Sequence, residues 1–156
     1  MIDLKSIASK ITSNHTCSIS SSPEMIINEL GDKEYSVNGE LHREDGPAIE
    51  SRNGYKAWYL YGKIHREDGP ALECINGDKS WYINDKRHRE DGPAIERANG
   101  AKEWWVNGKR HREDGPAIEY ANGEKSWYLD GNIVHHNKKT WDQIVKERKI
   151  KNIMSA

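Results

Sequence analysis

The sequence predicts a mainly β fold: a single-layer antiparallel β-meander, or solenoid, of stacked hairpin repeats, with short helices capping the N- and C-termini. Two observations predict it. The block His-Arg-Glu-Asp-Gly-Pro-Ala occurs four times in 156 residues, and its copies start 23 residues apart at His42, His65, His88 and His111. Between the blocks an Asn-Gly pair recurs, and a lysine and then a tryptophan follow it at two-residue intervals. A fixed period of this length is typical of repeat proteins, in which each unit packs on its neighbours.

The period also sets the expected boundaries of the array. A degenerate copy precedes the first block and starts near Pro23, while the last block has decayed to Val134-His135-His136-Asn137. We therefore expect an N-terminal helix and loop over 1–22, the hairpin array over 23–136 and a C-terminal segment over 137–156.

The Asn-Gly pairs predict tight hairpins. Asn-Gly between alternating apolar residues favours a two-residue type I′ turn, because both central residues of that turn have positive φ. With Asn53-Gly54 as the loop, Ile49 lies opposite Trp58. The same register pairs Leu72 with Trp81, Ile95 with Trp104 and Ile118 with Trp127.

A second turn follows each tryptophan, at Tyr61-Gly62 and the equivalent positions, and its register places His65 opposite Trp58. One apolar face should then form the structural core. Its expected members are the tryptophans, the block histidines and their aliphatic neighbours: Trp58, Trp81, Trp104, Trp127, His42, His65, His88, His111, Ile49, Leu72, Ile95 and Ile118. The Asp-Gly-Pro step predicts a bend or a strand start in each unit, because proline lacks the amide donor.

The opposite face is the candidate binding surface. It carries the row Tyr59, Tyr82, Trp105 and Tyr128, beside which the register places Arg66, Arg89 and Arg112. Tyr, Trp and Arg are enriched in interface hot spots. A row that recurs in every unit also fits a purely architectural role. The residues that break the pattern are therefore further candidates for partner contact: Tyr55, Tyr61, Cys74, Arg97, Tyr120, His135 and His136.

The register further predicts cross-strand ion pairs. Each block glutamate should face a lysine, which pairs Glu44 with Lys33, Glu67 with Lys56, Glu90 with Lys79 and Glu113 with Lys102. On the other face Arg66 and Glu50 should flank Ala57, and Arg89 and Glu73 should flank Ser80. In the third unit Glu96 should oppose Glu103, a like-charge contact that Arg112 would have to offset.

Both ends contain helix signals. Asp3 before Leu4 and Ile7 predicts a short amphipathic N-terminal helix. Thr140 and Gln143 form a capping-box pattern that predicts a helix over 140–153, with a basic face of Lys146, Arg148, Lys149 and Lys151. We expect this helix to cap the open end of the sheet; the alternative is a docking helix for an acidic partner or nucleic acid.

Composition and charge narrow the function. The 24 basic and 25 acidic residues give a net charge of -1, so no overall field attracts nucleic acid or an anionic membrane. No apolar run reaches the ~20 residues of a membrane span and no signal peptide is evident, which favours the cytoplasm. Cys17 and Cys74 have no metal-ligand spacing and are expected to be free thiols. Equivalent His, Glu and Asp residues of successive units lie about 9.5 Å apart, too far to share a metal, so we expect no catalytic residue, no metal site and no cofactor.

The pattern Asn107-Gly108-Lys109-Arg110-His111, followed by Gly115 and then Ala121-Asn122-Gly123, resembles the MORN repeat, whose unit is also 23 residues and rich in Gly and aromatics. The likeness covers about residues 31–136. MORN units usually have Gly directly after the His, whereas here Arg-Glu-Asp intervenes, a variant similar to one found in bacteriophage, bacterial and large-virus proteins. The resemblance implies a single-layer sheet used for binding or scaffolding and supplies no catalytic residues.

These observations lead us to expect a non-enzymatic, repeat-based protein-binding or scaffolding module. In its sharpest form the hypothesis is a phage-related inhibitor of a host defence protein, acting in the host cytoplasm on a protein partner. Self-association through the tryptophan face is a second mode of assembly. The alternative is a nucleotide or small-anion sponge that uses the aromatic and Arg face, and a structural virion component is the third hypothesis.

Overall fold

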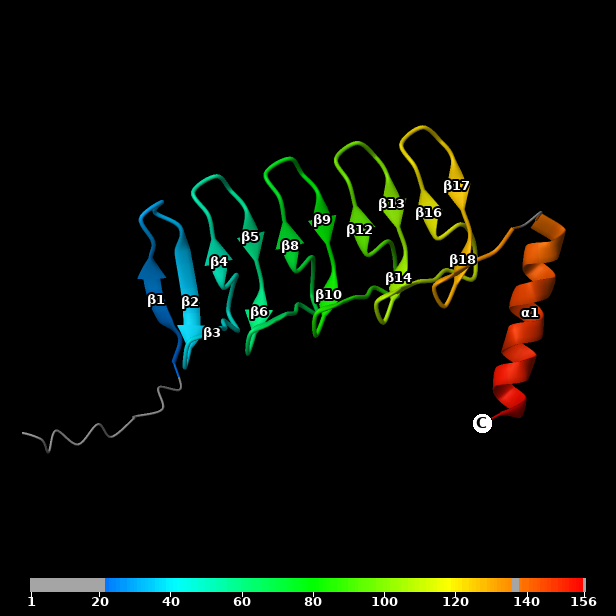
Figure 1. Cartoon of the computed structure of the whole chain (residues 1–156), viewed down its shortest axis with the longest axis horizontal. Helices are drawn as coiled ribbons and strands as arrows, with labels where there is room; N and C mark the ends of the chain where they lie inside the picture. The colour runs from blue at the N-terminus through cyan, green and yellow to red at the C-terminus, as the bar shows by residue number, and fades with distance from the viewer. Residues whose placement is uncertain (1–21, 136–137, 156) are drawn as a thin grey trace, which may run out of the picture.

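The computed structural model describes residues 22–135 and 138–155, and it shows one long antiparallel sheet followed by one helix (Figure 1). The mainly β, single-layer fold with a C-terminal helix is as the sequence predicts. The predicted N-terminal helix lies outside the described residues.

The main sheet has eleven strands: β1 (Glu24–Ile27), β2 (Lys33–Val37), β3 (Glu40–Leu41), β4 (Ile49–Glu50), β5 (Lys56–Ala57), β8 (Leu72–Glu73), β9 (Lys79–Ser80), β12 (Ile95–Glu96), β13 (Lys102–Glu103), β16 (Ile118–Glu119) and β17 (Lys125–Ser126). Four small hairpins accompany it: β6 (Tyr59–Leu60) with β7 (Lys63–Ile64), β10 (Tyr82–Ile83) with β11 (Lys86–Arg87), β14 (Trp105–Val106) with β15 (Lys109–Arg110), and β18 (Tyr128–Leu129) with β19 (Asn132–Ile133). The helix is α1 (Lys138–Met154).

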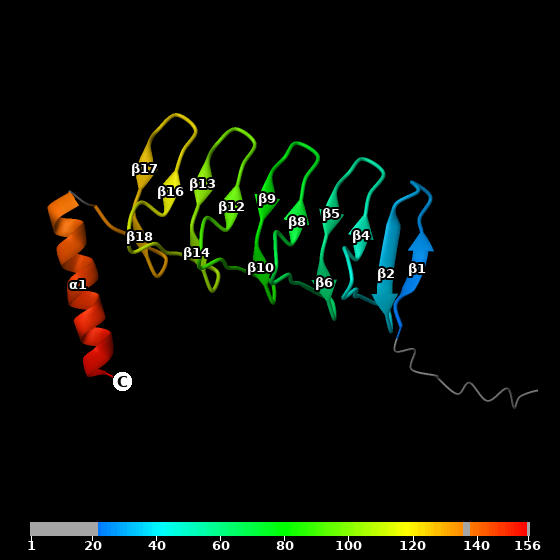
Figure 2. The ribbon, with the colours of Figure 1, turned by 180° about the vertical axis from the view of Figure 1, so that it is seen from behind.

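Each repeat builds the same path through the sheet. The chain forms an upper hairpin such as β4–β5, passes the tryptophan, forms a lower hairpin such as β6–β7, and crosses to the next unit through a loop such as 65–71 (Figures 1 and 2). The loop contains the Asp-Gly-Pro step, and the next strand begins two residues after the proline. The predicted bend and strand start are thus confirmed, and the bend extends over a loop of several residues.

The lower turns confirm their predicted type and register. Tyr61 and Gly62 have φ of 48° and 73°, as a type I′ turn requires, and the other lower turns also have two positive φ angles. Beyond the turn the amide of His65 donates to the carbonyl of Trp58 at 3.1 Å. His65 therefore lies opposite Trp58 as predicted.

The upper turns contain three residues, so their predicted two-residue register is wrong. The Ser51 amide donates to Tyr55 O and the Gly54 amide donates to Ser51 O, both at 2.9 Å, and within the loop 52–54 only Gly54 has positive φ. This is a type I turn closed by a glycine bulge. Asn53 does not have the positive φ expected of it. Its side-chain oxygen instead accepts a hydrogen bond from the Tyr55 amide at 2.9 Å, as in an Asx turn.

A register shift of one residue moves every side chain of a strand to the other face. The aliphatic residues predicted beside the tryptophans instead lie on the tyrosine face: Ile49 opposite Ala57, Leu72 opposite Ser80, Ile95 opposite Glu103 and Ile118 opposite Ser126. The charged pairs change in the same way: Glu50 with Lys56, Glu73 with Lys79, Glu96 with Lys102 and Glu119 with Lys125. The predicted Glu96–Glu103 opposition is therefore absent from this register.

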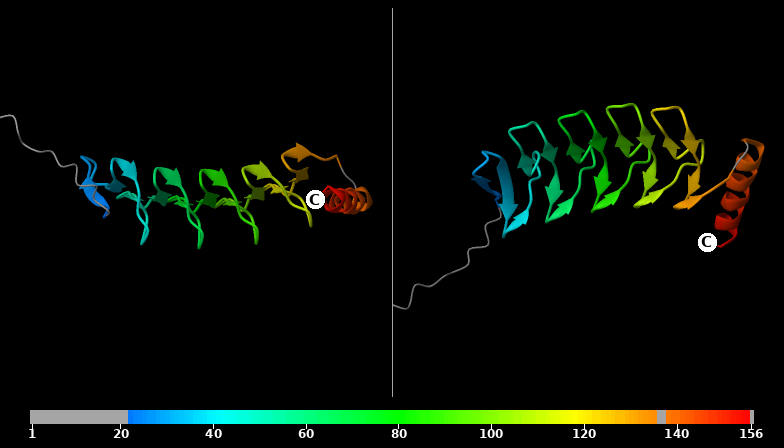
Figure 3. Two further views of the ribbon diagram at one scale, coloured as in Figure 1. Left: turned by 90° about the horizontal axis from the view of Figure 1, so that it is seen from below. Right: turned by 45° about the horizontal axis from the view of Figure 1, so that its top comes forward.

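The core of this single layer is made largely of alanine. Ala48, Ala57, Ala71, Ala94 and Ala117 have no exposed surface, and Ile95, Ile118 and Leu129 are also buried. Of the predicted core histidines, His42 is buried and the others are half-buried, as are all four repeated tryptophans. Within the described residues no second sheet or helix covers either face (Figure 3). Because these central residues are small, the larger side chains of neighbouring strands pack over them and bury them.

Helix α1 spans the predicted range 140–153 and stands at the C-terminal end of the sheet (Figure 1). Trp141 is buried against the last unit, whereas Ile150, Ile153 and Met154 at the other end of the helix are exposed. None of the described helical segments combines the length and the apolar composition required to cross a membrane.

Candidate functional site

The block arginine is the centre of each crossing loop. In the third loop the Arg89 Nε donates to the Asp91 carboxylate at 2.8 Å, and Nη1 donates to Pro93 O at 3.2 Å and to Glu96 at 3.0 Å. The other loops repeat the arrangement around Arg43, Arg66 and Arg112, with arginine–glutamate distances of 2.7, 3.6 and 3.2 Å. The predicted flanking of Ala57 by Arg66 and Glu50 is wrong, because each arginine pairs with the glutamate seven residues later, on the strand that follows its own loop.

Each of these arginines also stacks on an aromatic ring of the preceding unit. The guanidinium carbon lies 4.0 Å from the ring centre for Arg66 on Trp58, 4.1 Å for Arg89 on Trp81 and 3.9 Å for Arg112 on Trp104. Arg43 makes the same contact with Tyr35 at 4.0 Å. The predicted binding face therefore separates: Arg66, Arg89 and Arg112 lie on the tryptophan face, and Tyr59, Tyr82, Trp105 and Tyr128 lie on the opposite face.

The glycine of the block leaves room for this arginine. A Cβ at Gly92 would lie 3.0 Å from Arg89 Cζ, and the equivalent glycines have the same close contact at 2.9–3.1 Å. Hydrogen bonds from the arginine, together with its charge, lower the pKa of Asp91 below the usual aspartate value. The same cause lowers the pKa of Asp45, Asp68 and Asp114.

The block histidine joins each unit to the next. Its Nδ1 accepts the amide of the first residue of the next lower turn: Tyr61 for His42 at 3.1 Å, Asn84 for His65 at 3.3 Å, Asn107 for His88 at 3.2 Å and Asp130 for His111 at 3.2 Å. His42 additionally packs against Tyr61, with ring centres 4.1 Å apart and the ring planes tilted by 41°. The histidine thus has a structural partner in every unit.

Open grooves lie between successive loops on the tryptophan face. The groove between the second and third loops has Trp81 and Ile83 as its floor and a volume of about 590 Å³. Equivalent grooves of about 700 and 890 Å³ have Trp58 with Leu60, and Trp104 with Val106, as floors. Arginines form the walls, and the rims carry the Glu and Asp of both flanking loops. The repeat therefore produces the same surface several times along one face.

The rim glutamates project into solvent. The side chains of Glu44, Glu67 and Glu90 are 78%, 84% and 83% exposed, and the carboxylate of each lies 3.6–3.8 Å from Nε2 of the histidine in its own loop. The predicted glutamate–lysine pairs of these loops are wrong, since the lysines face the strand glutamates instead. Residues 22–137 contain 16 basic and 22 acidic residues, so the array is acidic although the whole chain is nearly neutral.

The tyrosine face has its own arginines, which the sequence did not identify. Arg87 lies over the rings of Tyr82 and Trp105 at 5.6 and 5.1 Å, and Arg110 lies over those of Trp105 and Tyr128 at 4.9 and 5.4 Å. These arginines occupy the position that is Ile64 in the first unit. The change from isoleucine to arginine at this position was the signal in the sequence. Only the register of the lower turns shows which aromatic rings the arginines contact.

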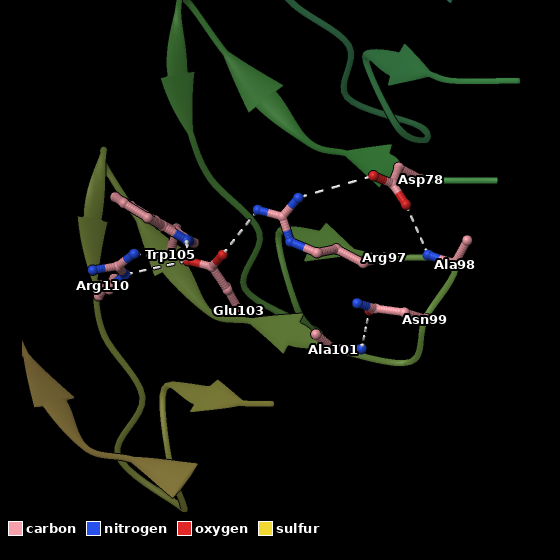
Figure 4. Close-up of polar contacts among 8 residues, drawn as sticks. All are labelled: Asp78, Arg97, Ala98, Asn99, Ala101, Glu103, Trp105 and Arg110. Carbon is pink, nitrogen blue, oxygen red and sulfur yellow. Dashed lines mark hydrogen bonds and ion pairs between the residues drawn. The ribbon is translucent and has the colours of Figure 1, made fainter. Parts of the chain in front are cut away.

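Glu103 neutralises Arg110, the second of these two arginines (Figure 4). One oxygen of the Glu103 carboxylate, Oε2, accepts hydrogen bonds from Trp105 Nε1 at 3.2 Å and from Arg110 Nε and Nη2 at 3.2 and 3.1 Å. The other oxygen, Oε1, accepts a hydrogen bond from Arg97 Nη2 at 3.3 Å. Arg97, one of the residues singled out for breaking the repeat, also approaches Asp78 at 3.9 Å. This cluster explains why glutamate can replace the small residue found here in the other units.

The remaining pattern-breaking residues are not gathered into one site. Tyr61 and Tyr120 are exposed, Tyr55 is half-buried, and Cys74 is an exposed free thiol. His135 is exposed, while His136 and Cys17 lie outside the described residues. In the part of the chain that the structure describes, no group of three or more His, Cys, Asp or Glu side chains is arranged to hold a metal ion.

Comparison with known proteins supplies no relative from which a role could be transferred: no protein-family model matches the chain, and no curated protein matches it.

Proposed function

We propose that the chain is a non-enzymatic protein-binding module, a MORN-like variant whose repeated grooves contact one partner that spans several units. The observation that carries the proposal is the recurrence of the same open groove, with an aromatic floor and a charged rim, at successive units of one face. A row of equivalent sites suits a ligand longer than a single groove, because each added contact becomes intramolecular once the first has formed.

The chemistry of the loops supports binding more than catalysis. The Arg, Asp and His side chains that could act as acids, bases or charge stabilisers are held by partners within the protein, such as Arg89 by Asp91, Glu96 and the Trp81 ring. The groove floors instead offer tryptophan and aliphatic surface, which is the composition of interface anchor pockets.

Selection from a random peptide library displayed on the surface of cells tests this function. Peptides enriched on the wild-type chain should lose binding to the Ile83→Arg variant, which fills a groove floor. The matched control is Ile64→Arg on the opposite face, which introduces the residue already present at positions 87 and 110. Failure to enrich any peptide, or equal binding to both variants, contradicts the proposal. A hydrogen-exchange footprint of the best peptide on the wild-type chain gives the same answer without a variant.

One observation favours small-anion binding as a second candidate. Arg87 makes no ion pair within the described residues, and its buried Nε has no hydrogen-bond partner, whereas the equivalent Arg110 is neutralised by Glu103. The guanidinium between Tyr82 and Trp105 therefore has a donor left to bind a phosphate or carboxylate. Thermal-shift measurements with nucleotides and inorganic phosphate test it, because a ligand of the folded state raises the melting temperature. The rise should vanish in Arg87→Gln and persist in Arg52→Gln.

A further inference from the structure

The C-terminal helix already shows how a basic segment can bind a block loop. Lys149 Nζ lies 2.7 Å from the Glu113 carboxylate of the fourth loop, and the Trp141 indole donates to the Glu113 backbone carbonyl at 3.0 Å. Arg148 pairs with Asp130 of the neighbouring turn. Lys149 also lines the groove between the third and fourth loops. One basic helix of this chain is thus seated at the rim of one groove.

The glutamates of the other three loops occupy the same place without such a neighbour. The Glu113 side chain is 41% exposed under α1, compared with 78% for Glu44, 84% for Glu67 and 83% for Glu90. The other polar residues of the block are fixed by short contacts inside the loop, as Asp91 is by Arg89 at 2.8 Å. The exposed glutamate is the block residue that the loop itself holds most weakly.

Charge complementarity indicates what would cover these glutamates. Residues 22–137 carry 22 acidic against 16 basic side chains, whereas α1 carries six basic against two acidic ones. Potentials of opposite sign steer association and set its specificity. A second basic helix from a partner would meet the same rim chemistry that Lys149 meets at Glu113.

The repeat distance also sets the spacing of the partner's cations. Each unit adds two strands to the main sheet, so equivalent glutamates lie about 9.5 Å apart along the array. Seven residues of an α-helix rise about 10.5 Å and return the side chain to nearly the same face. Lysines at a seven-residue interval on a helix would therefore meet successive loops.

We propose that Glu44, Glu67 and Glu90 form a lysine-recognition row that binds a basic amphipathic helix of a protein partner, with one lysine at each loop. The row deepens the proposed protein-binding function and rests on it. The helix lies along the array, and its apolar side chains between the lysines face the groove floors formed by Trp58 and Trp81.

Fluorescence anisotropy with synthetic helical peptides and the full chain tests this row. One peptide carries three lysines at seven-residue intervals, and the second carries the same residues with the lysines at five-residue intervals, which spreads them around the helix. The first should bind about tenfold more tightly at low salt, because three ion pairs form together. Equal binding of the two peptides, or binding of neither, overturns the proposal; tighter binding of an extended peptide with lysine at every third residue overturns the helical partner.

Matched variants separate recognition from net charge. The triple variant Glu44→Gln, Glu67→Gln and Glu90→Gln should lower the affinity for the first peptide roughly tenfold. The triple variant Glu24→Gln, Glu29→Gln and Glu124→Gln should change this affinity less than about twofold. Both variants remove three negative charges from exposed positions, and their melting temperatures report that they fold. An equal loss in both would show attraction to net charge alone and overturn the row. Library peptides that bind the grooves but contain no basic residues would also overturn it while leaving the protein-binding function intact.

Discussion

The Arg89 guanidinium lies 4.1 Å above the centre of the Trp81 ring and joins two units of the array, because the tryptophan belongs to the unit before the arginine. In a sheet of one layer the tryptophan face has no opposing layer to bury it. The arginine replaces part of that layer: its flat cation covers one face of the indole, and its donors are satisfied by Asp91, Glu96 and Pro93 O. The rest of the half-buried Trp81 side chain stays open to the groove.

Lysine should not substitute for this arginine. Arg89→Lys keeps the charge but loses the planar stacking and the fork of donors, so we expect a loss of about 1–3 kcal/mol in the free energy of unfolding. Urea denaturation followed by tryptophan fluorescence measures it. Arg52→Lys, at the exposed tip of the first upper hairpin, is the control and should change stability by less than about 0.5 kcal/mol. Equal effects of the two substitutions would contradict the role of the stacked guanidinium.

Gly92 and Arg89 should be energetically coupled. A Cβ at Gly92 would lie 3.0 Å from Arg89 Cζ, so Gly92→Ala must shift the guanidinium by a few tenths of an ångström against the hydrogen bonds and the Trp81 contact that hold it. We expect a cost of about 1–3 kcal/mol. In the Arg89→Ala background the same change should be neutral or stabilising by about 0.4–1 kcal/mol, because alanine restricts the unfolded chain. A double-mutant cycle measures the difference, and additive effects would show that the close contact carries no energy.

The loop aspartates should make stability acid-sensitive. The pKa of Asp45, Asp68, Asp91 and Asp114 is lowered in the folded state, first by the hydrogen bond from the neighbouring arginine. Their contribution is therefore complete above the unfolded aspartate pKa of about 3.9 and is lost as pH falls through the lower folded value. Melting temperatures of wild type and Asp68→Asn/Asp91→Asn should differ at neutral pH and converge in acid. Asp142→Asn, on the helix, should retain the wild-type acid slope.

The 23-residue period was sufficient to predict the architecture, the lower turns and the histidine–tryptophan pairing. The upper register was wrong because Asn-Gly serves two turn types. In a two-residue turn the asparagine takes positive φ, whereas in a three-residue turn Asn53 keeps negative φ and its side chain binds the Tyr55 amide. A signal for the correct register was present: only the three-residue loop places Glu50 opposite Lys56, with opposite charges facing each other in every unit.

The candidate site could be predicted only in part. The sequence indicated rows of aromatic residues and arginines, but it assigned Arg66 to the tyrosines, whereas the structure places it on Trp58. That placement depends on how loop 65–71 crosses between units, which no local pattern determines. Arg97 was recognised by its departure from the repeat; its partner Glu103 was misread as a like-charge conflict because of the register error.

The block histidines should control cooperativity between units. In His88→Ala the Asn107 amide loses its acceptor, which we expect to cost about 1 kcal/mol and to weaken the interface at the middle of the array. Because the stability of a repeat protein depends on its nearest-neighbour interfaces, urea unfolding should become broader. His135→Ala, at an exposed position in the decayed block, is the control. An unchanged transition width in His88→Ala would show that the backbone alone couples the units.

Trp141 should determine whether helix α1 stays on the array. Its side chain is 3% exposed and donates to Glu113 O, whereas the apolar residues at the far end of the helix are exposed. Trp141→Ala should therefore remove about 3 kcal/mol of docking energy. A 17-residue helix is only marginally stable alone. Its amide protection from hydrogen exchange should disappear while the hairpin units remain protected, since distant repeats do not contact it.

The control for this release is Ile150→Ala, which truncates a side chain that is 49% exposed on the same helix and should preserve helix protection. Release should also uncover Glu113, whose partner Lys149 leaves with the helix. The fourth loop would then present the same free glutamate as the other three loops, so Trp141→Ala should bind the lysine-bearing helical peptide more tightly than wild type. Loss of protection throughout the array would instead make the helix part of one folding unit with the sheet.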